Sequence, residues 1–280
     1  MTLHAGVLGH PITHSLSPVL HRAAYRSLGL DWTYDAIDVP QEQFAGFLGA
    51  LTDDWVGLSL TMPLKQEVLS HLDERSADVV ATCAANTLVF ERTASGTRLC
   101  GHNTDIDGIV RAIGEAPLCA QRKTAAIVGA GATAASAVAA LGRLGFERAD
   151  VVLRSMARRG PVESAAAAVG MELTYNLTGD FAAVAANADV MVSTLPGGAG
   201  DSLVDKVVPA VRPGAVLLDV AYEFRPSVLG SAWRAAGGTY VSGERMLLHQ
   251  AVAQVELFAG ARPDVAVMDA ALRRVLDSRD

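Results

Sequence analysis

Aromatic residues are scarce in this sequence, and their scarcity limits the folds it can adopt. They make up only 5% of the 280 residues, although half of all residues are hydrophobic. Small aliphatic side chains must therefore build the core, which favours helices layered on a parallel sheet over a β-sandwich. A chain of this length can form one large domain or two of ordinary size.

Cysteines and metal-ligand clusters are also few. The three cysteines have no CxxC spacing (Cys83, Cys100 and Cys119), so neither a disulfide framework nor a zinc site is expected. Three histidines lie near the N-terminus without acidic partners (His10, His14 and His21), so we expect no metal there.

The charge balance and hydropathy argue against two kinds of partner. The net charge is -7, which provides no basic surface for nucleic acid. No basic segment followed by an apolar run opens the chain, and no apolar stretch reaches the ~18 residues of a membrane span. We expect a cytoplasmic protein that binds a small molecule; whether it is a monomer or a homodimer stays open.

Strand and helix signals alternate in the first third of the chain. Apolar strands are expected at 5–9, 32–39 and 56–60, helices at 18–28, 41–51 and 65–71, and a strand pair at 86–91 and 97–103 with TASG as its turn. This alternation predicts an α/β domain with a mostly parallel sheet.

A second α/β series begins at residue 125. Residues 125–155 read as a strand, a glycine turn, an Ala-rich helix and a second strand, and two more apolar strands lie within 188–196 and 215–222. Helices are expected at 245–258 and 265–277. We therefore predict a substrate-binding and catalytic domain at 1–104, completed by helices in 245–280. A Rossmann-type dinucleotide-binding domain is predicted at 105–244.

The glycine turn GAGATA has the pattern of a pyrophosphate-binding loop. Gly129 permits a tight turn, Gly131 lets the backbone approach the pyrophosphate, and Ala134 allows close helix–strand packing. Its place between an apolar strand and a helix is what the motif requires. The alternative is an ordinary Gly-rich strand-to-helix turn.

The second strand of this unit ends in basic rather than acidic residues. An acid there would bind the ribose 2′-OH of NAD, but this chain has Leu153, Arg154 and Ser155, followed by Arg158 and Arg159. Guanidinium groups can bind a 2′-phosphate bidentately, so the pattern predicts NADP. The alternative is a solvated basic surface at the start of a helix.

Several polar motifs recur in one order along the chain: GHPITHSLSP (9–18), LSLTMPLK (58–65), AANT (84–87), GHNTDIDG (101–108), GAGATA, STLP, DVAY and GERMLLHQA (243–251). In sequence and separation they resemble the shikimate dehydrogenase family over nearly the whole chain. The resemblance implies reduction of 3-dehydroshikimate to shikimate with NADPH, in aromatic amino acid biosynthesis. It also implies a two-domain α/β fold with the active site in the cleft between the domains.

Two residues are candidates for the proton transfer that accompanies hydride transfer to or from a ring carbon. Lys65 matches the family's catalytic lysine, and Asp105 would orient Lys65 and the substrate hydroxyl. Burial of a lysine makes its neutral form accessible and a nearby carboxylate opposes this, so which group carries the proton stays open. The alternative is a surface lysine and a helix-capping aspartate.

The resemblance also implies a set of substrate ligands. Ser15, Ser17 and Tyr222 fit the carboxylate of shikimate, and Thr61, Asn86 and Gln250 fit its ring hydroxyls. Each also has a plainer interpretation: Ser17 as a helix N-cap, Asn86 as a turn residue, and Gln250 as a solvent-facing side chain. The cofactor-binding residues implied are Gly129, Ala130, Gly131, Ala132, Thr133, Arg154, Ser155, Arg158, Thr194, Val220, Gly243 and Met246.

The sequence departs from the family pattern at three places. Ser59 stands where the lysine motif often has Asn, which predicts looser positioning of nearby loops. The arginine motif opens with Leu153, and the segment after Ser193 reads TLPGG. None of these changes removes a group that does chemistry.

Two other functions remain open at this point. One is a quinate/shikimate dehydrogenase that uses NAD in the oxidative direction, against which the basic LRSMARR argues. The other is a catalytically silent NADP-binding sensor. A sensor would not need Lys65, Asp105 and Gln250 together, so their joint presence favours an enzyme.

Overall fold

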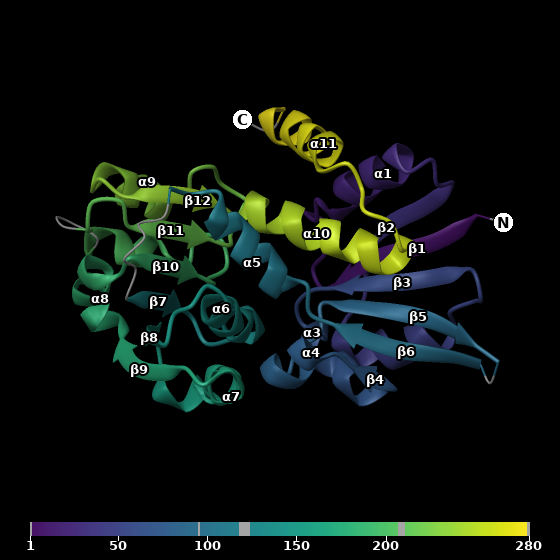
Figure 1. The fold of residues 1–280 in the computed structure, drawn as a ribbon, viewed down its shortest axis with the longest axis horizontal. Coiled ribbons are helices and arrows are strands. Elements are labelled where there is room, and N and C mark those ends of the chain that lie inside the picture. The colour runs from purple at the N-terminus through teal and green to yellow at the C-terminus, as the bar shows by residue number, and fades with distance from the viewer. Residues whose placement is uncertain (1, 95, 118–123, 207–210, 279–280) are drawn as a thin grey trace. The chain divides into compact units, whose positions relative to one another are not determined.

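The computed structural model describes residues 2–94, 96–117, 124–206 and 211–278 (Figure 1). The chain forms two compact units. Unit 1 comprises Met1–Val80, Ala84–Thr104 and Gln250–Asp280, and unit 2 comprises Ala81–Cys83 and Asp105–His249. No helix within the described ranges is both long and apolar enough to cross a membrane.

The sheet of unit 1 has six strands: β1 (Leu3–Gly9), β2 (Trp32–Asp38), β3 (Trp55–Leu60), β4 (Glu74–Arg75), β5 (Thr87–Thr93) and β6 (Gly96–His102). Their order is β2-β1-β3-β5-β6-β4, and β5 runs antiparallel to both of its neighbours. The other pairings of this sheet are parallel, so the prediction of a mostly parallel sheet is confirmed.

Helical segments accompany this sheet along the chain: α1 (Ser17–Ser27), η1 (Gln41–Gln43), α2 (Phe44–Gly49), α3 (Leu64–Glu67), η2 (Val68–His71), α4 (Ala77–Thr82), α10 (Gly243–Ala259) and α11 (Val265–Asp277), where η marks a 3-10 helix. One core joins the sheet to α2 and α3, with Leu8 and Leu58 packed among Phe44, Leu64 and Val68. Helices α1 and α11 pack against each other.

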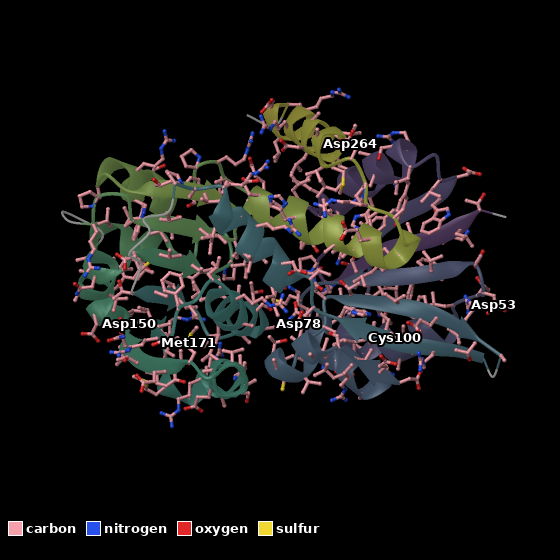
Figure 2. The ribbon with its side chains drawn as sticks, in the orientation of Figure 1. Asp53, Asp78, Cys100, Asp150, Met171 and Asp264 are labelled. Atoms are coloured by element: carbon pink, nitrogen blue, oxygen red, sulfur yellow. The ribbon has the colours of Figure 1, made fainter. Side chains whose placement is uncertain are left out.

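The start of α11 is fixed by Asp264, which is labelled in Figure 2. Its Oδ1 accepts hydrogen bonds from the backbone N–H of Ala266 at 2.9 Å and of Val267 at 3.3 Å. These bonds satisfy two donors that a helix N-terminus otherwise leaves unpaired.

Asp264→Ala should therefore lower the free energy of unfolding by about 1 kcal/mol, the usual effect of losing an N-cap side chain. Thermal denaturation followed by circular dichroism would measure the change. Asp264→Asn keeps an acceptor oxygen and serves as the control. Equal losses in the two variants would show that the cap does not stabilise α11.

Unit 2 contains the predicted Rossmann-type repeat. Its strands are β7 (Ala125–Val128), β8 (Arg148–Leu153), β9 (Glu172–Leu177), β10 (Val190–Ser193), β11 (Val216–Asp219) and β12 (Thr239–Ser242). Its remaining helical segments are α5 (Asp105–Gly114), α6 (Ala132–Arg143), η3 (Met156–Arg158), α7 (Gly160–Val169), η4 (Thr178–Asp180), α8 (Phe181–Asn187), η5 (Asp201–Lys206) and α9 (Val228–Ala235).

All strand pairs in this second sheet are parallel, in the order β12-β11-β10-β7-β8-β9. The order reverses between β7 and β10, and ligands of open α/β sheets bind outside the carboxyl ends of the strands at such a point. Val128 and Ser193 are the last residues of these two strands, and the GAGATA and TLP segments follow them. The fold therefore places both segments at the expected binding edge.

Most predicted elements are present, with two kinds of difference. The helices expected at 41–51 and 65–71 are each divided into a 3-10 turn and a short α-helix. Three strands that the sequence did not indicate lie at sheet edges: β4 in the first sheet, and β9 and β12 in the second. The expected turn TASG includes Ser95, which lies outside the described residues, as does Cys119.

Candidate active site

The glycine loop of unit 2 has the geometry that a pyrophosphate requires. Gly129 has φ = 116°, a conformation that L side chains rarely adopt, and a Cβ there would collide with the Thr194 hydroxyl. A Cβ on Gly131 would meet no atom within 4 Å, so the backbone is open at the N-terminus of α6. No side chain caps this helix end, and its first N–H groups can therefore bind an anion.

The helix behind this loop packs closely on the sheet. Ala134, the third small position of the motif, is fully buried, and so is Ala135. Across the loop, the backbone N–H and the hydroxyl of Thr194 both donate to the carbonyl of Val128, each at 2.9 Å. These bonds hold the ends of β7 and β10 together at the point where the strand order reverses.

Basic side chains lie just after β8. Arg154 and Arg158 are exposed, and no carboxylate of the described residues lies within ion-pair distance of either. Arg159 differs, because its Nε is 2.9 Å from Glu163 Oε1 and its guanidinium lies 5.7 Å from the ring centroid of Tyr175. Ser155 caps the intervening 3-10 turn. Arg154 and Arg158 can thus bind an added phosphate without first breaking an ion pair.

In unit 1 a buried polar cluster surrounds Asn86. Its Oδ1 accepts hydrogen bonds from the backbone N–H of Thr104 and the hydroxyl of Thr87, both at 2.8 Å. Its Nδ2 donates to Thr104 Oγ1 at 2.9 Å and to Gln250 Oε1 at 3.4 Å. Gln250 is only 7% exposed, so its interpretation as a solvent-facing side chain is wrong. Asn86 does lie at a bend, directly before β5, but its side chain is also buried, at 3% exposure, and hydrogen-bonded at both ends.

The serine loop before α1 is held from two sides. Asp38 Oδ2 accepts a hydrogen bond from His10 Nδ1 at 2.8 Å, and its Oδ1 accepts one from the N–H of Ile12 at 3.0 Å. The Oγ of Ser15 accepts from the N–H of Ser17 at 3.3 Å. Leu16, not Ser17, is the N-cap of α1, so the helix-cap interpretation of Ser17 is wrong.

Lys65 lies just past the carboxyl end of β3. Thr61 forms the turn that precedes it, because its carbonyl accepts the N–H of Leu64 at 2.8 Å. The carbonyl of Lys65 accepts the N–H of Ala85 at 2.8 Å, next to Asn86. The first sheet therefore brings together Thr61, Lys65 and Asn86 at one of its edges. The positions of their motifs in the sequence do not by themselves predict this proximity.

The remaining predicted residues lie in unit 2. Asp105 is the first residue of α5 and only 4% exposed, whereas Tyr222 lies in the partly exposed loop after β11. A Cβ on Gly243 would collide with the carbonyl of Val220, so only glycine allows α10 to begin there. Met246 is 7% exposed and packs in the core of this unit.

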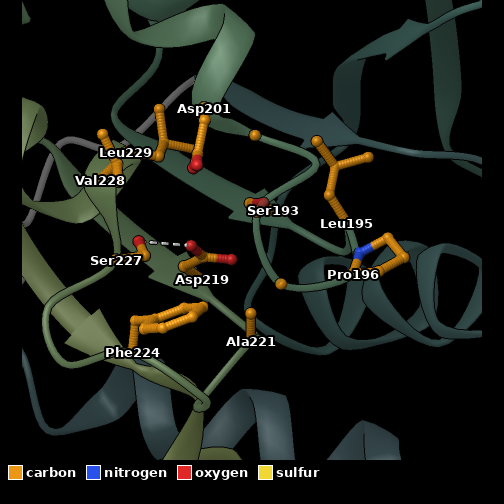
Figure 3. A pocket seen from close by; sticks show the side chains of 13 residues that line it. Ser193, Leu195, Pro196, Asp201, Asp219, Ala221, Phe224, Ser227, Val228 and Leu229 are labelled. Atoms are coloured by element: carbon orange, nitrogen blue, oxygen red, sulfur yellow. Dashed lines mark hydrogen bonds between the residues drawn. The ribbon is translucent and has the colours of Figure 1, made fainter.

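Figure 3 shows a pocket in unit 2, beside the ends of β10 and β11. Asp219 lies in it and accepts a hydrogen bond from Ser227 Oγ at 2.7 Å. Burial raises the pKa of the Asp219 carboxyl, and the bond from Ser227 opposes that rise. Ser227 also caps α9 through the N–H of Gly230 at 2.9 Å. Asp219 thereby ties the start of α9 to the end of β11, from which the Tyr222 loop departs.

Residues that sequence reasoning missed support these clusters: Tyr34, Asp38, Thr87, Thr104, Asp219 and Gln254. Their signal was weak, because each is an ordinary polar residue in a strand, a helix or a turn. Groups of three or more metal-ligating side chains are absent from the described part of the chain.

Unit 2 has a Rossmann-type sheet with a phosphate-binding loop and a basic end to its second strand. Unit 1 of the same chain is an α/β unit with a buried cluster of amides and hydroxyls. Together these features define the class of NADP-linked oxidoreductases. Comparison with known proteins gives the family. Residues 7–88 match the shikimate dehydrogenase substrate binding domain, and residues 243–273 match the shikimate 5'-dehydrogenase C-terminal domain.

Full-length relatives agree with these matches. The chain is 32% identical over 277 residues to the shikimate dehydrogenase (NADP(+)) of Methanothermobacter thermautotrophicus, covering 97% of this chain and 96% of that protein. The crystal structure of Mycobacterium tuberculosis shikimate dehydrogenase is 40% identical, with a TM-score of 0.85 over 98% of this chain and 99% of that one. The chain belongs to the shikimate dehydrogenase family.

A structure named for a different activity is also similar. Quinate dehydrogenase from Corynebacterium glutamicum, in complex with NAD, is 27% identical with a TM-score of 0.82, covering 98% of this chain and 99% of that one. Its lower identity places this chain nearer to the mycobacterial shikimate dehydrogenase.

Proposed function

We propose that this protein reduces 3-dehydroshikimate to shikimate with NADPH, reversibly, as a step of aromatic amino acid biosynthesis. The observation that carries the proposal is the pairing of two features in one chain. An uncapped helix N-terminus with unpaired arginines fits NADP, and a buried set of amides and hydroxyls beside Lys65 fits a polyhydroxylated ring acid. We place the enzyme in the cytoplasm.

The residues of this chain bind the substrate, orient it and move a proton. Ser15, Ser17 and Tyr222 hold the substrate carboxylate, and hydroxyl and amide groups of unit 1 hold the ring hydroxyls (Thr61, Asn86 and Gln250). When shikimate is oxidised, Lys65 takes the proton of the reacting hydroxyl and Asp105 orients both groups.

The bound cofactor supplies or accepts the hydride. The glycine loop (129–133) holds its pyrophosphate, and the ends of β10, β11 and β12 shape the nicotinamide side (Thr194, Val220, Gly243 and Met246). Arg154, Ser155 and Arg158 bind the 2′-phosphate. This last contact is what separates the proposed function from an NAD-linked one.

A turnover assay tests the proposal directly. Purified protein should oxidise shikimate with NADP⁺ faster than with NAD⁺, and should oxidise quinate more slowly than shikimate. Faster turnover of quinate with NAD⁺ would instead assign the activity of the C. glutamicum neighbour. No turnover of either acid, with NADP⁺ binding retained, would indicate a sensor.

Ser17→Ala should weaken shikimate binding by about 1–3 kcal/mol, because a charged carboxylate would lose a hydrogen-bond donor. Thermal stability should fall only modestly, since the Ser17 side chain does not cap α1. Calorimetry with shikimate and a melting curve separate the two effects. A fall in melting temperature with unchanged shikimate affinity would remove Ser17 from the site.

A further inference from the structure

Ser59, the residue that departs from the family pattern, is part of a continuous chain of buried hydrogen bonds in unit 1. The Tyr34 hydroxyl donates to Ser59 Oγ at 2.6 Å, and Ser59 Oγ donates to Gln254 Oε1 at 2.8 Å. Gln254 Nε2 donates to Thr87 Oγ1 at 3.0 Å, and Thr87 Oγ1 donates to Asn86 Oδ1 at 2.8 Å. The expectation that Ser59 loosens its surroundings is therefore wrong.

The donors of this chain all point one way, from Tyr34 towards Asn86. Each member is at most 3% exposed, so water does not compete for these bonds. Gln254 Nε2 is also 3.2 Å from the carbonyl of Asn86, which gives that residue a second link to the chain. The Thr87 hydroxyl and the Thr104 N–H both donate to Asn86 Oδ1, so the Asn86 Nδ2 is the end that donates to Thr104 Oγ1 and Gln250. The chain of hydrogen bonds thus reinforces an amide orientation that the Thr104 N–H also favours.

Small residues of the sheet make room for this arrangement. Tyr34 on β2 is in register with Ala5 on β1, and Ala5 is in register with Gly57 on β3. A Cβ on Gly57 would collide with the ring of Phe258, so α10 approaches the sheet at this glycine. Gln254 lies one turn before Phe258 on the same helix and reaches Ser59, two residues after Gly57.

Tyr34 is also coupled to the serine loop. The ring of His21 stacks on that of Tyr34 at 3.8 Å between centroids, and His21 Nδ1 donates to the carbonyl of Ser17 at 3.0 Å. Burial lowers the pKa of His21 to about 4, so this histidine is neutral at physiological pH. Burial also raises the pKa of Tyr34 well above its usual value, and hydrogen bonds with Ser59 and Ser17 oppose that rise. Its phenol therefore stays protonated and remains a donor.

We infer that Tyr34 and Ser59 are positioning residues for substrate binding, which orient Asn86 through Gln254 and support Ser17 through His21. Neither residue needs to touch the substrate in this role. The inference rests on the proposed function, because it takes Ser17 and Asn86 as ligands of shikimate. It explains how Ser59 is compatible with an ordered site: the tyrosine hydroxyl and the Gln254 amide hold it on both sides.

Tyr34→Phe tests the inference, with Tyr25→Phe as its matched control. Both tyrosines are buried in unit 1 at no more than 1% exposure, but the Tyr25 hydroxyl has no hydrogen-bond partner in the described structure. Tyr34→Phe should raise the KM for shikimate about 3- to 10-fold, the loss expected for one buried hydrogen bond. Tyr25→Phe should leave that KM unchanged. The KM for NADP⁺ should stay the same in both variants, since the glycine loop belongs to unit 2.

Ser59→Ala removes the next member of the same chain of hydrogen bonds. It also keeps the test possible if Tyr34→Phe does not fold. It should raise the shikimate KM by a similar factor, and the double variant should be no worse than the poorer single variant, because both remove one path. If wild type, Tyr34→Phe and Ser59→Ala had equal KM values for shikimate and the variants differed only in a lower melting temperature, the chain of hydrogen bonds would have a structural role only. A wild-type protein that neither binds nor oxidises shikimate would overturn the proposed function, and this inference with it.

Discussion

Lys65→Ala should lower the turnover of shikimate by at least about 100-fold, because positioned acid–base catalysis typically contributes ~10²–10⁴-fold. NADP⁺ affinity, measured by calorimetry, should stay within about threefold of wild type, or ~0.7 kcal/mol. The reason is that Lys65 belongs to unit 1 and the glycine loop to unit 2. This combination of results would distinguish an enzyme from an NADP-binding sensor.

The neighbouring Gln66→Ala is the control for the integrity of α3, since Gln66 is exposed and follows Lys65 directly. It should keep wild-type turnover. Asp105→Asn should also lose turnover, and the Lys65→Ala, Asp105→Asn double variant should lose far less than the product of the single losses, because the two act as a unit. Near-normal shikimate oxidation by Lys65→Ala would refute this mechanism, whatever the family membership.

Arg154→Ala should weaken NADP⁺ binding by roughly 1.5–3 kcal/mol, or about 10- to 100-fold, because a charge-assisted contact to the 2′-phosphate is lost. The KM for NAD⁺, which lacks that phosphate, should hardly change. Steady-state kinetics with both cofactors provide the measurement.

Arg159→Ala is the matched control for this experiment. Arg159 belongs to the same basic segment but is already paired with Glu163 and lies over the Tyr175 ring. We expect it to affect NADP⁺ binding less than Arg154→Ala does. If the Arg154 variant lost NADP⁺ and NAD⁺ affinity equally, its side chain would contact something other than the 2′-phosphate.

The parts of the fold that could be predicted are those with a local pattern. The GAGATA loop was recognisable because an apolar strand precedes it and an Ala-rich helix follows it. The edge strand β9 was not, because its sequence ELTYNL lacks an apolar run and its residues are exposed or only partly buried. Edge strands bury less surface than central ones, so their sequences carry a weaker hydrophobic signal.

The residues of the candidate site also fall into a predictable and an unpredictable group. Motif residues such as Lys65 and Asn86 could be proposed from the sequence, since each lies in a recognisable segment. Their supporting residues could not, because the bond from Ser59 to Gln254 joins positions 195 residues apart. Only the folded chain brings such donors and acceptors together. Sequence reasoning therefore named the proposed ligands but misjudged Ser59, whose partners come from another strand and a distant helix.

The alanine-rich helix α6 has a consequence for how the cofactor loop is held. Alanine has no side-chain rotamers to lose on folding. Burying the alanines of α6 therefore adds almost nothing to the side-chain entropy cost of forming unit 2. Five of its alanines are buried: Ala134, Ala135, Ala137, Ala139 and Ala140. The helix whose N-terminus we propose to face the phosphates is thus packed mainly through small side chains, with Val138 and Leu141 as its larger buried residues. A core built mainly of small residues can, for that reason, hold the loop at little cost in side-chain conformational entropy.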